Sequence, residues 1–337
     1  MSVNNTVLAS ALQYRSKGYL DSISKQIALW EWFRKKGRYI SQDGGKTIEW
    51  NTERKLDLDE HSFADYDTIV IKPTDQVVTP SANWKQYAAP IVISGEEKRK
   101  NTGPTRIFDL MAQKEQNALN SLTQQFNTHL YQDGTGNDSK RITGLLAILP
   151  EDPTTGTLYG INRATAGYEF FRSYEEGPVG AAWDISDANS PLVNSMHTLR
   201  IKCGRLKIGG AKQRYPDLGL CTENIFAWYE QVLQKTGLRF RNTDTGDMGF
   251  DSVAYHGMTL FHDEDMPQDA GAEEQMYFIN SNFFKLIYHP DANMKPTDMT
   301  RHVSQEAFSA FIVWMGELIC EVPAKSGLLH GVTAPQA

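Results

Sequence analysis

The side chains best suited to chemistry lie in one short acidic run, residues 262–265, which reads His-Asp-Glu-Asp and follows His256 at a distance of six residues. One imidazole and several carboxylates could close around a cation if the chain turned there. No spacing fixes three of these ligands on one face, and a strand end followed by an acidic loop is the commoner explanation. A metal-dependent enzyme is therefore kept only as an alternative, and the sequence predicts no catalytic residue, no metal site and no cofactor.

Other familiar signatures of catalytic and nucleotide sites are missing. The sequence contains no P-loop, no His-Glu-x-x-His and no Gly-x-Ser-x-Gly elbow, and the glycine pair of residues 133–136 does not extend to Gly-x-Gly-x-x-Gly. That stretch also fails as a calcium loop, because Asp138 stands where the sharp turn needs glycine. The three cysteines, Cys203, Cys221 and Cys320, have no Cys-x-x-Cys spacing, so we expect buried free thiols.

The composition is that of a mostly folded chain. Of 337 residues, 40% are hydrophobic and 22% are charged, and at about 150 residues per domain the length suggests roughly two domains. The 34 basic and 41 acidic residues give a net charge of −7, which disfavours a dedicated nucleic-acid binder. The longest uncharged apolar runs, 307–316 and 142–150, are too short to span a bilayer, and the N-terminus does not resemble a secretory signal.

The hydrophobic pattern predicts an α+β organisation with no βαβ rhythm and no internal repeat. A helical rhythm in the N-terminal segment ends at Gly37, after a basic cluster that suits either a solvated helix end or a contact with an acidic group. A long helix is predicted over residues 104–131, because Pro104 suits a first turn and Gly134 follows the end. Shorter helices are predicted over 192–203 and 222–237, and strands over 218–221, 257–262, 276–280 and 308–322.

Residues 46–72 are predicted to form a long hairpin with a charged tip. Ile48 and Trp50 alternate with polar residues on the outgoing arm, and Ile69 and Ile71 do so on the return arm. Two strands alone are marginal in water and their outer edges offer unpaired backbone groups. We therefore expect the hairpin to lie either on its own domain or on a neighbouring subunit.

The long helix is predicted to have one apolar stripe and one nearly uncharged face. Most exposed helix faces carry many Lys and Glu side chains, so this composition is either chance or functional. The amide side chains of this face are Gln113, Gln116, Asn117, Asn120, Gln124 and Asn127.

Several weak motifs occur in a specific order along the chain. They read NWKQYAA at 83–89, IVISGE at 91–96, LYQDGTG at 130–136, DPTTGT at 152–157, LFHD at 260–263 and YFIN at 277–280. In this order and spacing they resemble the major capsid proteins of tailed bacteriophages, which are built on the Hong Kong 97 fold. The resemblance covers roughly residues 40 to 325.

This resemblance implies a division of the chain into the parts of that fold. The axial domain is expected to surround the symmetry axes of pentamers and hexamers. The expected parts are an N-terminal arm at 1–45, an extended loop at 46–78, a peripheral domain at 79–140 and 296–325 with a spine helix at 104–131, an axial domain at 141–295, and a C-terminal tail at 326–337.

The resemblance also implies a function without catalysis. Copies of the chain would assemble in the host cytoplasm into the icosahedral capsid of a virion around double-stranded DNA, contacted weakly and non-specifically. The further partners implied are a portal, a possible decoration protein and, because the N-terminal region is short, a separate scaffolding protein; no membrane is involved. The alternative with the same fold is an encapsulin-type nanocompartment that holds a cargo enzyme.

Two sets of residues acquire roles from the resemblance. The extended loop would lie over a neighbouring subunit, and the spine helix would face the shell interior, where few charges suit packed DNA. A covalent cross-link, for which Lys55 could be offered, is not expected, because lysine is common in hairpins. The interface residues are Ile48, Trp50, Ile69 and Ile71, and the interior-facing ones are Gln113, Gln116, Asn120 and Gln124.

Overall fold

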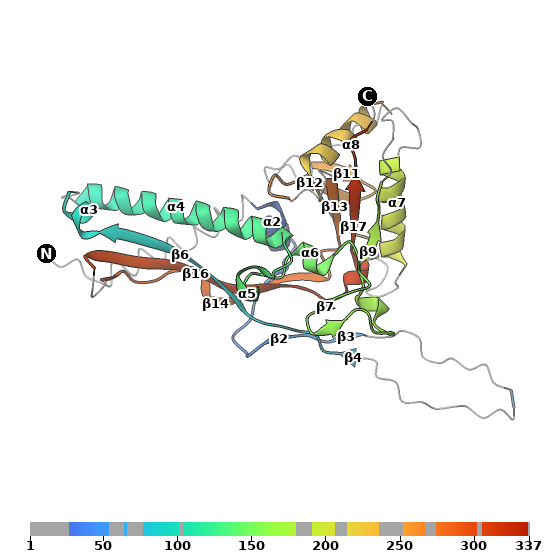
Figure 1. Cartoon of the computed structure of the whole chain (residues 1–337), viewed down its shortest axis with the longest axis horizontal. Helices are drawn as coiled ribbons and strands as arrows, with labels where there is room; N and C mark the ends of the chain where they lie inside the picture. Colours follow the sequence, from blue (N-terminus) through green and yellow to red (C-terminus); the bar gives the residue numbers. More distant parts are fainter. Residues whose placement is uncertain are drawn as a thin grey trace.

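The computed structural model describes residues 27–53, 64–65, 77–100, 104–179, 191–205, 214–235, 252–266, 274–301 and 305–335. Figure 1 shows two parts side by side. In the first, a long helix lies along a sheet of long strands. In the second, a six-stranded sheet stands between two shorter helices, so the mixed α+β organisation is confirmed.

The first sheet is built on three long antiparallel strands. β16 (Ala307–Cys320) pairs with β6 (Lys85–Ser94) along one edge and with β14 (Phe284–Pro296) along the other. Two short strands complete it, β1 (Tyr39–Ser41), parallel to β14, and β15 (Thr300–Arg301). Side chains of β6 alternate between buried and exposed, as a strand with one covered face requires.

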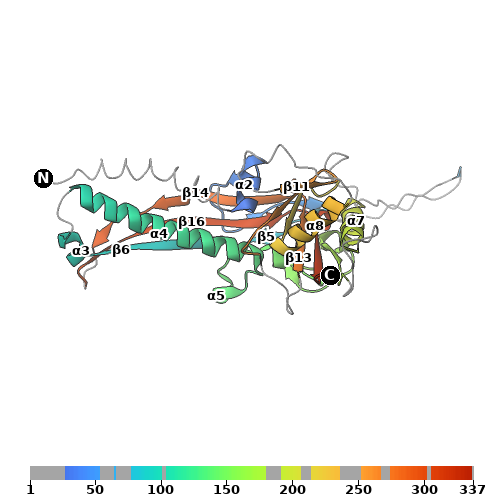
Figure 2. The same ribbon diagram turned by 90° about the horizontal axis from the view of Figure 1, so that it is seen from above.

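The covering element is the spine helix α4, which runs from Pro104 to Tyr131, the bounds predicted from the sequence. It lies along one face of the first sheet (Figures 1 and 2) and follows a short helix α3 (Gly95–Lys100). Phe126 of α4 packs against Trp30 and Trp314, with ring centroids 4.7 Å and 4.8 Å away. This aromatic group, fully buried, forms the centre of the larger hydrophobic core.

Trp30 belongs to α2 (Ala28–Lys35), the end of the helical rhythm predicted in the N-terminal segment. Its Trp30 and Phe33 side chains are buried, and the helix ends before Gly37, whose φ of +67° is a left-handed conformation that glycine adopts readily. From residue 27 onward, the expected N-terminal arm is thus part of the core and joins the first sheet through β1. Residues 1–26 lie outside the described part of the chain.

The second sheet has the strand order β11-β12-β10-β13-β17-β9. Helices α7 (Pro191–Gly204) and α8 (Glu223–Lys235) pack on it, and both confirm sequence predictions within two residues at each end. The strands are β9 (Tyr174–Glu176), β10 (Leu218–Cys221), β11 (Ser252–Tyr255), β12 (Met258–His262), β13 (Glu274–Ile279) and β17 (Gly327–Val332).

β17 corrects the expected C-terminal tail at 326–337. Residues 327–332 lie inside the second sheet, between β13 and β9, and Leu328 and Leu329 are fully buried. Two adjacent leucines suit a strand whose two faces are both covered. The chain therefore enters the second sheet once more after leaving β16.

The strand register also corrects the hairpin. β2 (Ile48–Glu49) pairs with β5 (Ser81–Ala82), and β3 (Thr52–Glu53) pairs with β4 (Val77–Val78). At its base, the return arm therefore lies at 77–82 and not at 66–71. Residues 54–63 and 66–76, which include Lys55, Ile69 and Ile71, lie outside the described residues.

Short elements connect the two parts. A second small hairpin is formed by β7 (Thr157–Leu158) and β8 (Ile161–Asn162). The others are the helical turns α5 (Gly136–Ser139), α6 (Leu145–Ile148), η1 (Glu169–Phe171) and η4 (Pro323–Lys325).

The three cysteines are free and buried, as expected. Burial raises the pKa of each thiol, to about 12 for Cys203. Among the described helices, none combines the length and apolar composition that a bilayer crossing requires.

Candidate assembly surfaces and the junction between the sheets

The outward face of α4 presents neutral amides. Gln113, Gln116, Asn120 and Gln124 are all exposed and follow one another at three- and four-residue steps. Gln116 donates to Asn120 at 3.0 Å. The two nearest charged side chains leave this face neutral. Lys114 forms an ion pair with Glu97 at 2.7 Å, and Glu115 is buried.

Asn127, counted with that face from the sequence, has a different place. It is buried, and its Nδ2 donates to Asp263 at 3.0 Å and to Asp265 at 2.8 Å, while the Tyr131 hydroxyl donates to Asp263 at 2.8 Å. The acidic run that suggested a cation site therefore binds the last turns of the spine helix. Sequence spacing could not reveal this contact, which joins residues 136 positions apart.

The two histidines of the metal candidate are not brought together. His262 lies beside Phe226, with ring centroids 5.1 Å apart, whereas His256 lies beside His197 at 5.9 Å. Across the described ranges, no three metal-ligating side chains gather.

The base of the extended loop packs on its own chain. Ile48 is fully buried in the larger core, and the indole of Trp50 meets the ring of Tyr159 edge-on at 4.9 Å. Ile48 therefore has no surface left to bury on a neighbour, which corrects its expected interface role, and Trp50 is largely committed to its own subunit. The other two expected interface residues, Ile69 and Ile71, lie in the part that the structure does not describe.

Exposed apolar side chains occur on the face of the first sheet opposite α4. Val92 and Phe311 are 49% and 41% exposed, and Phe311 lies directly opposite Pro90 in the strand register. Val77, at the base of the extended loop, is 56% exposed. Large apolar residues so exposed on adjacent strands are a feature of surfaces that become covered on association.

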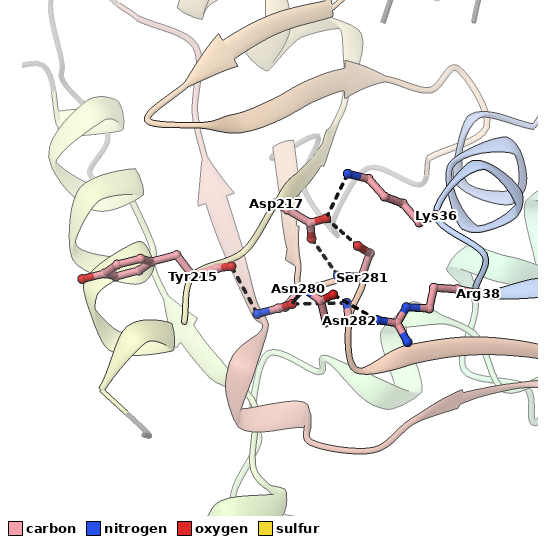
Figure 3. Close-up of polar contacts among 7 residues, drawn as sticks. All are labelled: Lys36, Arg38, Tyr215, Asp217, Asn280, Ser281 and Asn282. Atoms are coloured by element: carbon pink, nitrogen blue, oxygen red, sulfur yellow. Dashed lines mark hydrogen bonds and ion pairs between the residues drawn. The ribbon is translucent and has the colours of Figure 1, made fainter. Parts of the chain in front are cut away.

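A polar junction joins the two sheets (Figure 3). The chain passes from β13 to β14 through residues 280–283. Asp217, at the start of β10, accepts a hydrogen bond from the Ser281 amide at 2.7 Å and another from the Ser281 hydroxyl. The Asn280 side chain donates to the Tyr215 carbonyl at 3.2 Å, so the crossing segment is held from the second sheet.

The N-terminal segment reaches the same junction. Arg38 donates to the Asn282 side chain at 3.0 Å, and Lys36 lies 4.0 Å from the Asp217 carboxylate (Figure 3). The basic cluster at residues 34–38 was expected either to be solvated or to contact an acidic group, and the position of Lys36 supports the contact with an acidic group. The sequence identified the cluster and not its partner.

A buried carboxylic acid lies in the first sheet where β6, β16 and the turn after α4 meet. Glu317 accepts hydrogen bonds from the amides of Thr143 and Leu318 at 2.8 Å and 3.1 Å, and its second oxygen has no partner. Burial raises the pKa of Glu317 to about 8, against the opposing effect of these amides and of Lys85. Sequence alone gave no signal for it.

No protein-family model and no curated protein matches this sequence. Solved structures do match. The capsid subunit of Cyanophage A-1(L) superimposes with a TM-score of 0.63 at 17% identity, over 88% of this chain and 91% of that one. The capsid of a native GTA particle gives 0.55 at 13% identity, over 89% and 90%.

A third structure is an encapsulin complex, holo-SrpI from Synechococcus elongatus PCC 7942, with a TM-score of 0.58 at 9% identity over 91% of this chain and 89% of that one. Each of the three matches covers about nine tenths of this chain. The chain therefore has the Hong Kong 97 type of fold found in tailed-phage capsid proteins.

Proposed function

We propose that this chain is the major capsid protein of a tailed phage, which assembles with copies of itself into an icosahedral shell around double-stranded DNA. The observation that carries the proposal is the extent of the likeness to capsid subunits, which covers 88% of this chain and 91% of the cyanophage chain. So complete a match leaves little of the described chain for a separate catalytic domain. The proposed role is structural and needs no enzymatic activity.

The neutral face of α4 supports DNA as the content. Because phosphate contacts are electrostatic, a lining without exposed charge would tolerate densely packed DNA without binding it tightly. Gln113, Gln116, Asn120 and Gln124 are the lining in this proposal. In this proposal the subunit assembles in the host cytoplasm with a portal and a separate scaffolding protein, and a decoration protein is an optional further partner.

Contacts between subunits would come from the described apolar surfaces and from the extended loop. Phe311, Val92 and Val77 are exposed and large, and burying such a side chain contributes about 1.5–3 kcal/mol. Ile69 and Ile71 are the loop residues proposed to lie on a neighbour. Each contact is weak by itself, so closure of many contacts together would stabilise the shell.

The encapsulin-type compartment is the second candidate, because holo-SrpI shares the fold over a similar share of the chain. The two functions differ in what the shell holds. Particles purified from cells that carry the complete gene neighbourhood would be treated with nuclease and then opened. Protected double-stranded DNA supports the phage capsid, whereas a stoichiometric protein cargo without DNA supports the compartment and overturns the proposal.

The lining itself is tested by adding charge. The variant Gln113→Lys, Gln116→Lys, Asn120→Lys and Gln124→Lys should assemble and retain nuclease-protected nucleic acid more strongly than the unchanged protein, with a steeper salt dependence. A matched control places four lysines at exposed neutral positions of α7 and α8, namely Thr198, Ala227, Gln231 and Gln234. Equal retention by the two variants would show that the α4 face is not the lining.

A further inference from the structure

A group of hydrogen-bond donors lies where α7 meets the turn between β11 and β12, at the end of the molecule away from α4 (Figure 1). It consists of His197 and Arg200 from α7, of Tyr255 at the end of β11 and of His256 from the turn; we call it the α7 cluster. The His197 and His256 rings are 5.9 Å apart, and the Tyr255 and His256 rings are 4.8 Å apart.

Contacts hold the Arg200 guanidinium in place, but no carboxylate of the described residues neutralises its charge. Its guanidinium lies 4.1 Å from the centre of the Tyr215 ring, and one Nη donates to the His256 carbonyl at 3.2 Å. Its Nε is buried and has no hydrogen-bond partner, and in the described part of the chain Arg200 forms no ion pair. A partly buried guanidinium normally binds a carboxylate or another anion, because leaving its donors unpaired is costly.

Tyr255 supplies a second unpaired donor in the α7 cluster. The side chain is only 4% exposed, and its hydroxyl is buried without a partner. Burial raises the pKa of Tyr255 to about 12 although Arg200 opposes the shift, so the hydroxyl keeps its proton and can donate it.

The His256 ring lies beside two basic side chains, Arg200 and His197. Burial lowers the pKa of His256, and Arg200 and His197 lower it further. His256 also has a φ of +45°, followed by Gly257 at +83°, a tight turn that presents its ring at the surface. An anion at this point would offset the repulsion and favour the protonated ring.

We propose that the α7 cluster binds a tetrahedral oxyanion of the phosphate class, either free phosphate or the phosphodiester group of a nucleic acid. Arg200 would contribute the fixed charge, since its fork of donors matches phosphate oxygens. The Tyr255 hydroxyl and the His256 ring would donate to the remaining oxygens, and His197 would stand at the rim. The proposal does not rest on the shell function, because the four side chains belong to one subunit.

Calorimetric titration of the full-length protein tests the site, with inorganic phosphate as one probe and a 12-base-pair DNA duplex as the other. Binding of phosphate is measured at pH 6 and at pH 8 and compared between variants at the same pH, because phosphate itself gains negative charge over this range while the His256 ring loses its proton. Arg200→Gln should weaken it at least about tenfold. The matched control is Arg301→Gln, an exposed arginine of β15 in the other sheet, which should leave it unchanged.

His256→Asn serves as a second variant, because asparagine tolerates a positive φ and the position is exposed. It should weaken phosphate binding at pH 6 more than at pH 8. If both probes depend on Arg200, the site takes nucleic-acid phosphodiesters; if only phosphate does, it takes a small anion. Absence of phosphate binding in the unchanged protein, or equal losses in Arg200→Gln and Arg301→Gln, would overturn the proposal.

Discussion

The side-chain amide of Asn127 donates to the Asp263 carboxylate at 3.0 Å and thereby ties the end of the spine helix to the loop after β12. The same Nδ2 lies 2.8 Å from an oxygen of Asp265, and Tyr131, one turn further along α4, donates to Asp263 as well. One amide and one hydroxyl thus hold two carboxylates next to the core. The contact links the helix on the first sheet to the loop that follows a strand of the second.

We expect Asn127→Ala to lower the free energy of unfolding by about 2 kcal/mol, because hydrogen bonds to charged groups contribute about 1.5–3 kcal/mol each, and Asp265 and Asp263 would each lose the bond from Asn127 while Tyr131 still donates to Asp263. Urea unfolding followed by circular dichroism measures this. Asn117→Ala is the control, since Asn117 is exposed on the same helix and both substitutions raise helix propensity equally. Equal unfolding midpoints for the two variants would show that the contact is not stabilising.

The contact between Asn127 and Asp263 shows which features of the site can be predicted from the sequence and which cannot. The helix 104–131 was predictable to the residue, because its apolar stripe is long and Pro104 and Gly134 bracket it. Asn127 was misplaced on the exposed face, because amide residues look alike in a helical pattern whether they face solvent or a carboxylate. Only the fold brings Asp263 to within hydrogen-bond distance.

The hairpin shows that strand pairing, too, cannot be predicted from the sequence pattern alone. Alternation of apolar and polar residues identifies strands but does not fix their register, which depends on the length of the connection. Ile48 therefore pairs with Ala82 and not with a residue near position 70. Likewise, the sequence predicts a tail where β17 forms, because the pairing of β17 depends on β13 and β9, which are distant in sequence.

Glu317 predicts a dependence of stability on pH. Its pKa is raised from the usual 4.5 to about 8, so the folded protein holds a proton that the unfolded chain releases. The stabilisation is complete below about pH 4.5 and is lost progressively as the pH rises to about 8. We expect Glu317→Gln, which resembles the protonated acid, to make the free energy of unfolding fall less steeply across this range.

Chemical denaturation at intervals from pH 5 to pH 8.5 checks this expectation. Glu264→Gln is the control, because Glu264 is an exposed carboxylate of the loop after β12. That variant should follow the unchanged protein. Parallel pH profiles for Glu317→Gln and the unchanged protein would mean that Glu317 is ionised in the fold at neutral pH.

The junction between the sheets allows two contacts on one carboxylate to be compared. Asp217→Ala should destabilise the protein by about 2 kcal/mol and speed hydrogen exchange of the Ser281 amide at least about tenfold, because that buried amide loses its acceptor. Lys36→Gln should change stability by less than about 0.5 kcal/mol, since the Lys36 pair spans 4.0 Å and is partly exposed. A Lys36→Gln effect as large as that of Asp217→Ala would instead assign the strength of the junction to the ion pair.

Only the part of the extended loop beyond its base, residues 54–76, should be removable without loss of the fold. Replacing residues 54–76 with a short Gly-Ser link keeps the β2–β5 and β3–β4 pairs, and it keeps Ile48 and Trp50 in their own core, so the subunit should melt cooperatively near the unchanged temperature. It should not close into shells, because the proposed contact of Ile69 and Ile71 with a neighbour is gone.

A second variant that also removes residues 48–53 and 77–82 should lose roughly 3–5 kcal/mol of stability, which is the scale of emptying a large buried site such as that of Ile48. Calorimetry distinguishes the two variants, and electron microscopy shows whether the first assembles; normal shells from it would remove the loop from the intersubunit contacts.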